Sequence, residues 1–217
     1  MWLYLLILFL IVVLILVLFG SGIFIWFIHP TNPPPKKYPR KLIHNKLYEM
    51  MYNIDKEFVK HDVHYIAACG TLLGAIRDGG IIRHDFDIDI DCFEYQKELL
   101  NTVVEKICKK YGYKLYRNKV GYKIGDSETF DIKSHSGAWV DIYIRYENND
   151  IMEIRDRQYL KKYPKEEKIR KDWIFPIKRC EFNKNKINVP NHPEPILTQL
   201  YGDWKTPVVF SPGRLIE

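Results

Sequence analysis

Hydrophobic residues recur at intervals of three and four in three stretches of the chain, which is the spacing of one buried helix face. The longest pattern runs through residues 42–61. A second covers residues 99–111 and is closed by Gly112, and a third occupies residues 192–201 and stops at Gly202. Glycine just beyond the last turn is a common helix terminator. The pattern therefore predicts three amphipathic helices.

Shorter runs of β-branched and aromatic residues predict strands. Residues 65–69 are apolar and indicate a short buried strand, whereas residues 85–91 and 138–146 alternate between two kinds of position. Residues 113–124 alternate loosely and predict a strand and hairpin, and a further hairpin is expected between residues 174 and 190. The chain beyond residue 41 is thus expected to contain both helices and strands.

The first 28 residues contain no charged side chain. About 20 apolar residues suffice to span a bilayer, so this stretch predicts a transmembrane helix. A cleaved signal peptide is the alternative, but the apolar run is too long and no basic segment precedes it. Residues 29–41 hold five of the chain's 12 prolines and predict an extended stalk. Residues 42–217 remain for one globular domain.

The overall charge and the cysteines only narrow the range of possible partners and sites. The formal net charge of +6 suits an anionic partner without naming one. The four cysteines are widely separated and form no Cys-x-x-Cys pair. Their spacing argues against a structural zinc site and against a dense disulfide framework, and it leaves the redox compartment open.

The most unusual stretch is residues 84–91, in which every second residue is an aspartate: Asp85, Asp87, Asp89 and Asp91. An extended chain would place all four carboxylates on one face. Aspartate is disfavoured in strands and like charges repel there, so the row makes sense if a cation lies against it. Oxygen ligands of this kind suit Mg²⁺ or Mn²⁺.

Three other structures could explain the alternating aspartates. An EF-hand loop begins in the same way, but it needs glycine at its sixth position and an acid at its twelfth, where Ile90 and Gln96 stand. A solvated edge strand with spare charge is an alternative. The short Asp-x-Asp motif of nucleotide-sugar glycosyltransferases is another, and it stays open at this point.

Asp141 is a second anomaly, because it lies within the predicted strand 138–146. It either pairs with a nearby arginine or joins the acidic row around a metal ion. Strand interiors normally exclude aspartate, which favours the metal site.

Residues 70–77 predict a tight turn that leads into a short helix. Thr71 could cap this helix, and the free N–H groups at a helix start attract phosphate. Arg77 could bind a diphosphate with two hydrogen bonds, although a surface arginine is the alternative.

Residues 70–77 followed by residues 85–90 resemble the LicD-type phosphotransferases, the group that includes fukutin and fukutin-related protein. That group carries Gly-Thr-Leu-Leu-Gly-Ala-x-Arg and then an Asp-x-Asp-x-Asp strand. The resemblance covers roughly residues 42–207 and extends to four more segments, at 140–142, 175–177, 189–191 and 200–204. One departure is Arg83-His84, where the family usually has Pro-Trp.

This resemblance implies an α/β (α+β) nucleotidyltransferase-like domain with a small mixed sheet flanked by helices. It also implies transfer of a phospho-alcohol, such as phosphocholine or ribitol phosphate, from a CDP-linked donor to a hydroxyl of a glycan or glycoprotein. The implied metal ligands for Mg²⁺ or Mn²⁺ are Asp87, Asp89 and Asp141. Gly70, Thr71 and Arg77 would bind the donor phosphate, and Asp85 would either support the metal ligands or serve on the acceptor side. No nucleic acid partner is expected.

Two other function classes remain. A membrane-anchored glycosyltransferase would explain the anchor, stalk and Asp-x-Asp motif, and a non-enzymatic tethered relic would explain the fold alone. The location is also open. All four basic residues near the predicted span follow it, namely Lys36, Lys37, Arg40 and Lys41, which favours a cytosolic domain. The resemblance favours the lumen of the Golgi or endoplasmic reticulum if the host is eukaryotic.

Overall fold

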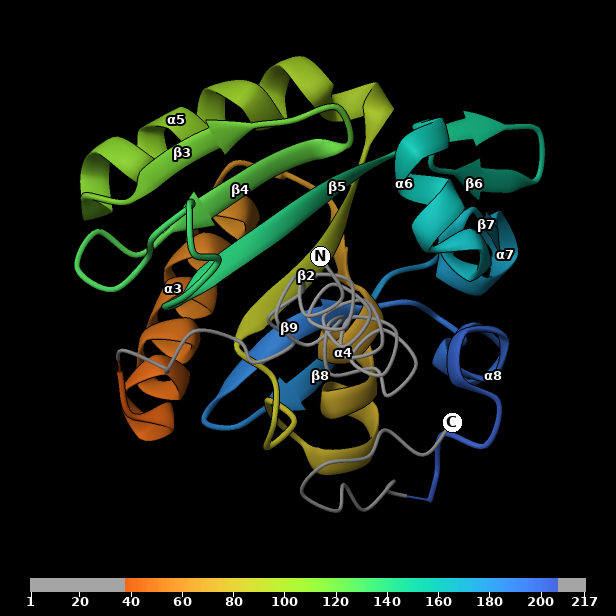
Figure 1. Ribbon diagram of the computed structural model, residues 1–217. Coiled ribbons are helices and arrows are strands. Elements are labelled where there is room, and N and C mark those ends of the chain that lie inside the picture. Colours follow the sequence, from red (N-terminus) through yellow and green to blue (C-terminus); the bar gives the residue numbers. More distant parts are fainter. Residues whose placement is uncertain (1–37, 207–217) are drawn as a thin grey trace, which may run out of the picture. The chain divides into compact units, whose positions relative to one another are not determined.

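The computed structural model describes residues 38–206, and a mixed β-sheet forms its centre (Figure 1). The main path of the sheet follows the order β1 (Tyr65–Ala67), β2 (Asp87–Phe93), β5 (Trp139–Asn148), β4 (Gly121–Gly125) and β3 (Lys114–Arg117). Along this path β2 and β5 pair in parallel, and the other neighbours are antiparallel. Two short strands extend the sheet beyond β5, namely β6 (Ile151–Glu153) and β7 (Lys168–Arg170).

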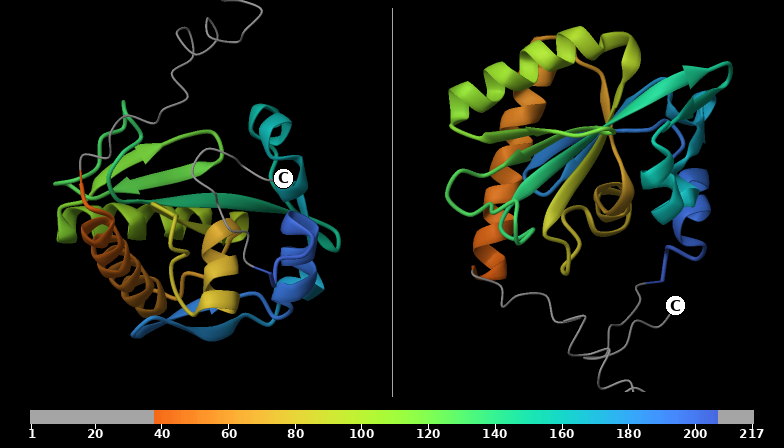
Figure 2. Two further views of the ribbon diagram at one scale, coloured as in Figure 1. Left: turned by 60° about the horizontal axis from the view of Figure 1, so that its bottom comes forward. Right: turned by 45° about the horizontal axis from the view of Figure 1, so that its top comes forward.

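The two long helices, α3 (Arg40–Lys60) and α5 (Lys97–Tyr111), contact each other and lie on the same side of the sheet (Figure 2). The apolar stripe predicted for α3 is buried, with Leu47, Ile54 and Phe58 at 0% exposure. The inward-facing side chains of β2 and β5, Ile88, Ile90 and Val140, are also 0% exposed. Burial of these chains against each other drives the folding of this layer.

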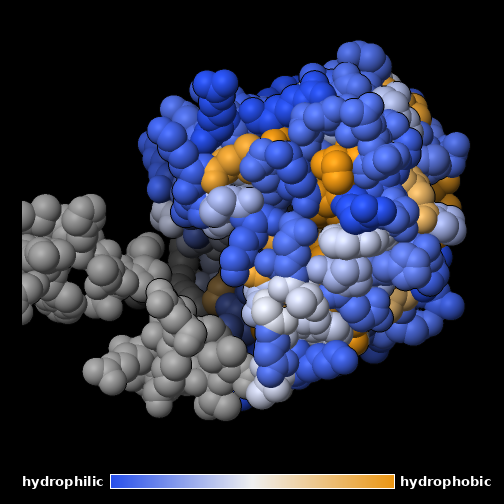
Figure 3. All heavy atoms as spheres, turned by 90° about the vertical axis from the view of Figure 1, so that its right-hand side faces the viewer, coloured by the Kyte–Doolittle hydropathy of each residue, from blue (hydrophilic) through white to orange (hydrophobic). Residues whose placement is uncertain are grey.

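Shorter elements complete the domain. The β1–β2 connection contains α4 (Cys69–Leu73), which continues as one π-helical turn, η1 (Gly74–Asp78). A separate hairpin of β8 (Lys178–Phe182) and β9 (Asn185–Val189) contacts β1 and η1. The remaining helices are η2 (Glu94–Gln96), α6 (Arg157–Lys162), η3 (Pro164–Glu166), α7 (Lys171–Ile174) and α8 (Pro193–Tyr201). The face built by α6, α7 and α8 is largely hydrophilic, with small separate hydrophobic patches (Figure 3).

The prediction of a mixed sheet flanked by helices is confirmed. Two of the boundaries that differ from the expectation bear on the charged residues discussed below. Helix α3 begins at Arg40, so Arg40 and Lys41 belong to its first turn and not to the predicted stalk. Strand β2 begins at Asp87, so Asp85 precedes it.

The predicted transmembrane anchor at residues 1–28 lies outside the described residues, as does most of the predicted stalk. Within residues 38–206, none of the helices combines the length and the apolar character that crossing a bilayer requires.

Candidate metal and donor site

The parallel pairing of β2 with β5 brings aspartates from distant parts of the chain together. Asp89 is the direct partner of Asp141 in this register, and Asp87 lies one side chain earlier on the same face of β2. One carboxylate oxygen from each of the three lies within 4.8 Å of the others. Three hard oxygen donors at this separation could bind a divalent metal ion. The structure therefore assembles the three residues that the sequence proposed as metal ligands.

The electrostatics of this group favour a cation. Burial raises the pKa of Asp87 to about 6, and the neighbouring charges of Asp141 and Asp85 act in the same direction. Burial also raises the pKa of Asp89 well above its ordinary value, again with help from Asp87 and Asp141. Like charges in a partly desolvated site disfavour ionisation, and a bound cation would reverse that effect.

Lys123 is the main cation already present at this group. Its Nζ lies 2.6 Å from Oδ2 of Asp141, directly across the β4–β5 pairing. Trp139 donates its Nε1–H to the same oxygen at 3.0 Å, and the lysine lies 4.7 Å from the centre of the Trp139 ring. Asp141 thus pairs with a lysine and not with an arginine, while it also belongs to the carboxylate group. One lysine faces three carboxylates.

Asp85 lies beside the group and is not a member of it. It precedes β2, and its backbone carbonyl lies 2.9 Å from Nε2 of His44. Its carboxylate rests against Gly70, where an added Cβ would come within 2.5 Å of Oδ2. Any side chain at position 70 would therefore displace Asp85. Burial raises the pKa of Asp85 as well.

Thr71 does not cap α4. The capping position belongs to Ala68, and α4 begins at Cys69. The Thr71 hydroxyl instead accepts a hydrogen bond of 2.8 Å from the backbone N–H of Asp89. This bond ties α4 to β2 and fixes the backbone that carries the candidate metal ligand.

Arg77 is engaged with its neighbour in the chain. Its Nε and one terminal nitrogen donate to the two carboxylate oxygens of Asp78 at 2.8 and 2.9 Å. Arg77 therefore lies outside the carboxylate group, and phosphate binding by Gly70, Thr71 and Arg77 stays a prediction.

Sequence reasoning missed a set of tyrosines beside Asp89. Tyr143 donates its hydroxyl to Oδ1 of Asp89 at 3.2 Å. Its ring is 5.4 Å from that of Tyr159, which in turn lies 5.0 Å from Tyr163. Tyr143 could have been found, because it alternates with Asp141 on the same face of β5. Tyr159 belongs to a lysine- and arginine-rich segment that gave no such signal.

Asp91, the fourth member of the acidic row, has a different environment. It forms an ion pair with Arg145 from β5, and the two side chains are 1% and 2% exposed. Arg145 also donates to the backbone carbonyl of Glu166 at 3.0 Å. Of the four aspartates expected on one face of one strand, three lie in β2, because Asp85 precedes it. Of those three, Asp87 and Asp89 belong to the carboxylate group and Asp91 does not.

A family model described as LicD/FKTN/FKRP, nucleotidyltransferase domain, matches residues 62–192. The matched part exceeds half of the chain and includes α4, β2 and β5. The chain belongs to this family. The resemblance inferred from the sequence motifs is thereby confirmed.

Two curated relatives are uncharacterized proteins of Rickettsia. The one from Rickettsia typhi is 26% identical over 168 residues, which cover 76% of this chain and 49% of that protein. The one from Rickettsia prowazekii is 25% identical over 170 residues, covering 78% and 59%. The chain thus spans about half to three fifths of the length of these relatives.

Solved structures with partial similarity include two antibiotic-modifying or resistance proteins. The lincosamide antibiotic adenylyltransferase LnuA, with lincomycin bound, has a TM-score of 0.42 at 17% identity, over 66% of this chain and 79% of that one. The antibiotic-resistance factor ANT(2'')-Ia has a TM-score of 0.38 at 15% identity, over 52% of this chain and 54% of that one.

Proposed function

We propose that this chain is a metal-dependent transferase that moves a phospho-alcohol from a CDP-linked donor to a hydroxyl group of a glycan. The observation that carries the proposal is the convergence of three carboxylates within 4.8 Å on two parallel strands of a LicD-family domain. Phosphocholine and ribitol phosphate are the alcohols that fit the family resemblance. Phosphoryl transfer depends mainly on positioning and charge stabilisation, and this site offers both.

In this proposal Asp87, Asp89 and Asp141 hold Mg²⁺ or Mn²⁺. When bound, the metal ion supplies positive charge to the diphosphate and to the departing CMP. Thr71 keeps the backbone of Asp89 in place through its hydroxyl. Lys123, whose side chain is only 12% exposed, neutralises part of the charge on Asp141.

The donor phosphates would lie near residues 70–77. Gly70 and Thr71 would contribute backbone N–H groups, and the Thr71 hydroxyl, which only accepts from Asp89, could also donate its O–H. Arg77 would keep its two bonds to Asp78 and donate to the diphosphate from its other terminal nitrogen.

Asp85 would act on the acceptor side. The acceptor oxygen attacks the phosphorus that bears the alcohol, the bond from that phosphorus to the CMP oxygen breaks, and the hydroxyl proton passes to Asp85. Partial burial raises the pKa of Asp85, and a carboxylate with a raised pKa is a stronger proton acceptor.

The test is CMP release by the full chain in detergent, measured by chromatography with CDP-choline, CDP-ribitol and a panel of UDP-sugars. CMP release from a CDP-alcohol is expected, and Asp89→Asn should lower it more than about 100-fold, beyond what losing a group that merely supports a ligand costs. Asp150→Asn, which removes an exposed aspartate on the hairpin β5–β6, should leave the rate unchanged. Sugar transfer from a UDP-sugar without any CMP release would instead favour the glycosyltransferase alternative.

Membrane attachment through residues 1–28 belongs to the same proposal. An anchor would keep the enzyme near a membrane-bound glycan acceptor, with the domain in the cytosol by charge bias or in the Golgi or endoplasmic reticulum lumen by family resemblance.

A further inference from the structure

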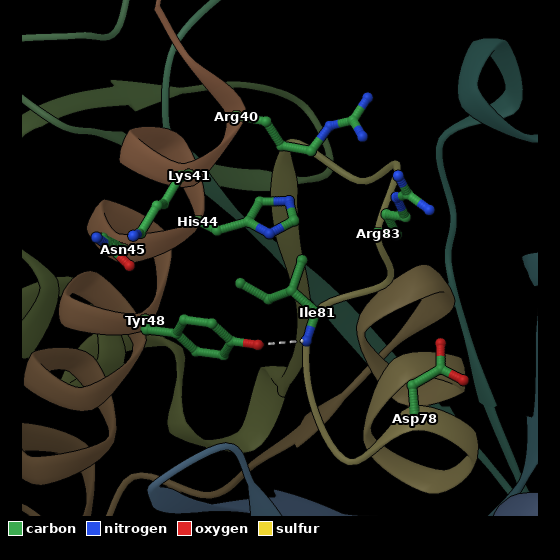
Figure 4. A pocket seen from close by; sticks show the side chains of 8 residues that line it. All are labelled: Arg40, Lys41, His44, Asn45, Tyr48, Asp78, Ile81 and Arg83. Atoms are coloured by element: carbon green, nitrogen blue, oxygen red, sulfur yellow. Dashed lines mark hydrogen bonds between the residues drawn. The ribbon is translucent and has the colours of Figure 1, made fainter.

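An open cleft of about 590 Å³ lies between the first turns of α3 and the segment that follows α4 (Figure 4). Arg40, Lys41 and His44 line it from α3, and Asp78, Ile81 and Arg83 line it from the other side. In Figure 4 the side chains of Arg40 and His44 reach from the helix toward the segment of Ile81 and Arg83. We call this space the α3 cleft. None of its lining residues belongs to the carboxylate group.

The charge of the α3 cleft is strongly positive. Arg40, Lys41 and Arg83 are basic, while the one lining carboxylate, Asp78, is already bound by Arg77 at 2.8 and 2.9 Å. Within residues 38–206, no hydrogen-bond or ion-pair partner contacts the side chain of Lys41 or Arg83. The Nε of Arg40 is buried and likewise has no partner in the described part of the chain. A buried donor without an acceptor is costly, so this arrangement suits an anion that enters the cleft.

The start of α3 adds to this imbalance. The first turn of the helix contains no acidic residue and has no side-chain cap, while Arg40 and Lys41 occupy it. Cations at the positive end of a helix dipole are unfavourable, whereas an anion there is stabilised. The charges of Arg40 and Lys41 therefore lie at the unfavourable end of this 21-residue helix, and a bound anion would offset them.

The walls of the α3 cleft are held in place. Tyr48 accepts a hydrogen bond of 2.9 Å from the backbone N–H of Ile81, which fixes the segment after η1 against α3. Gly80 permits this approach, because a Cβ there would come within 2.6 Å of the Tyr48 hydroxyl. Because this wall is already fixed, the cleft loses less conformational entropy when a ligand binds.

Two contacts link the α3 cleft to the residues that precede Asp87. Nε2 of His44 lies 2.9 Å from the backbone carbonyl of Asp85, and the guanidinium of Arg40 lies 5.7 Å from the ring of Phe86. Asp87 follows directly in the chain. A ligand in the α3 cleft would therefore lie next to the metal-capable group and leave that group free for a donor.

We propose that the α3 cleft binds a phosphate group carried by the acceptor, which rests on the transfer reaction proposed above. Two guanidinium groups and an ammonium group match a phosphate dianion better than a single carboxylate, because guanidinium binds phosphate oxygens in pairs. The acceptor is accordingly an anionic, phosphate-bearing glycan, and its reacting hydroxyl would lie toward Asp85.

The test measures binding of glucose 6-phosphate, glucuronate and glucose to the full chain in detergent with EDTA present, by calorimetry. Glucose 6-phosphate should bind at least about tenfold more tightly than either other sugar, because its phosphate accepts charge-assisted hydrogen bonds from the two guanidinium groups. Arg83→Ala and Arg40→Gln should each weaken its binding about tenfold. Arg157→Ala, which removes an exposed arginine on α6, should not change it. Asp89→Asn should not change it either, and CDP-choline should bind at the same time.

Several outcomes would overturn the proposal. Equal affinity for glucose 6-phosphate and glucose would show that the cleft does not recognise phosphate. Equal affinity for glucose 6-phosphate and glucuronate would show that it recognises negative charge without preferring phosphate. Loss of binding in Asp89→Asn, or competition by CDP-choline, would assign the anion to the donor site. Binding of phosphatidylglycerol in mixed detergent micelles without binding of glucose 6-phosphate would assign the cleft to a lipid headgroup. The calorimetric test does not depend on turnover. A chain that binds glucose 6-phosphate as expected but releases no CMP in the separate turnover assay would contradict the proposed reaction and still support the phosphate site.

Discussion

Two neighbouring positions of β2, Asp89 and Asp91, present the same side chain on the same face of the same strand, yet their surroundings differ in charge. Asp91 meets one guanidinium, that of Arg145, and both side chains are almost fully buried. Asp89 meets two further carboxylates, and the lysine nearest to them, Lys123, pairs with Asp141. The first arrangement balances its charge within the chain, and the second does not. An aspartate in a strand is therefore structural or ligand-binding according to the number of opposite charges that its neighbours supply.

The pairing register explains this difference. In the parallel ladder Asp89 lies opposite Asp141, whereas Asp91 lies opposite Tyr143 and reaches Arg145 one side chain further along the same face. A shift of β5 by two residues would place Arg145 beside a different aspartate. The sequence of β5 thus assigns the roles of the acids on β2.

The largest expected effect comes from breaking the balanced pair. Arg145→Met leaves the carboxylate of Asp91 buried without its partner, and removing one member of a buried ion pair typically costs about 3–5 kcal/mol. Urea unfolding of the full chain should show a loss of that size in the free energy of unfolding. The double variant Asp91→Leu with Arg145→Met should recover most of the loss, because it leaves no buried charge unpaired. A loss below about 1 kcal/mol for Arg145→Met would show that Asp91 does not depend on this arginine.

The unbalanced group should respond in the opposite direction. Burial raises the pKa of Asp87 from 3.8 to about 6, so the folded chain retains a proton between these pH values that the unfolded chain has released. The stabilising contribution of protonated Asp87 is present below about pH 4 and is lost as the pH rises through about 6. At pH 7.5 without metal, Asp87→Asn should therefore be more stable than the parent, by about 1–3 kcal/mol at about 1.4 kcal/mol per pKa unit.

A pH series with a control variant tests this effect of Asp87. Urea unfolding in EDTA at pH 4, 5, 6 and 7.5 should show the difference between Asp87→Asn and the parent shrinking toward acid pH. Asp150→Asn, on an exposed turn, should show no such trend. An Asp87→Asn variant that is less stable than the parent at pH 7.5 would mean that the ionised carboxylate is already balanced in the metal-free chain.

Local patterns predicted much of the fold. The three- and four-residue spacing identified α3, α5 and α8, and the two-residue alternation identified β2 and β5, because both periodicities follow directly from backbone geometry. The sequence also singled out Asp87, Asp89 and Asp141, because a carboxylate in a strand interior conflicts with the preferences of that structure. These features depend on a residue and its near neighbours only. The structure brings the three aspartates together within 4.8 Å, and their role as metal ligands stays a prediction.

The approach of Asp141 to Asp89 was expected, but other features that depend on the pairing of distant segments were not. The separation of Asp91 from the metal-capable group depends on Arg145, which lies 54 residues away in the chain. The bond of Thr71 to Asp89 depends on how the β1–α4 connection packs against β2, and helix-start rules alone suggested a cap instead. Arg77 is a different case, because its partner Asp78 is the next residue and was visible in the sequence.

The most direct test of the carboxylate group as a metal site is a calorimetric titration of Mn²⁺ into the full chain at pH 7.5. We expect one Mn²⁺ per chain in the parent and in Asp150→Asn, and binding at least about tenfold weaker in Asp87→Asn and Asp89→Asn, since each of these two variants removes one of three anionic ligands. Unchanged Mn²⁺ affinity in Asp89→Asn, or no Mn²⁺ binding by the parent, would contradict the assignment of Asp87, Asp89 and Asp141 to a metal site.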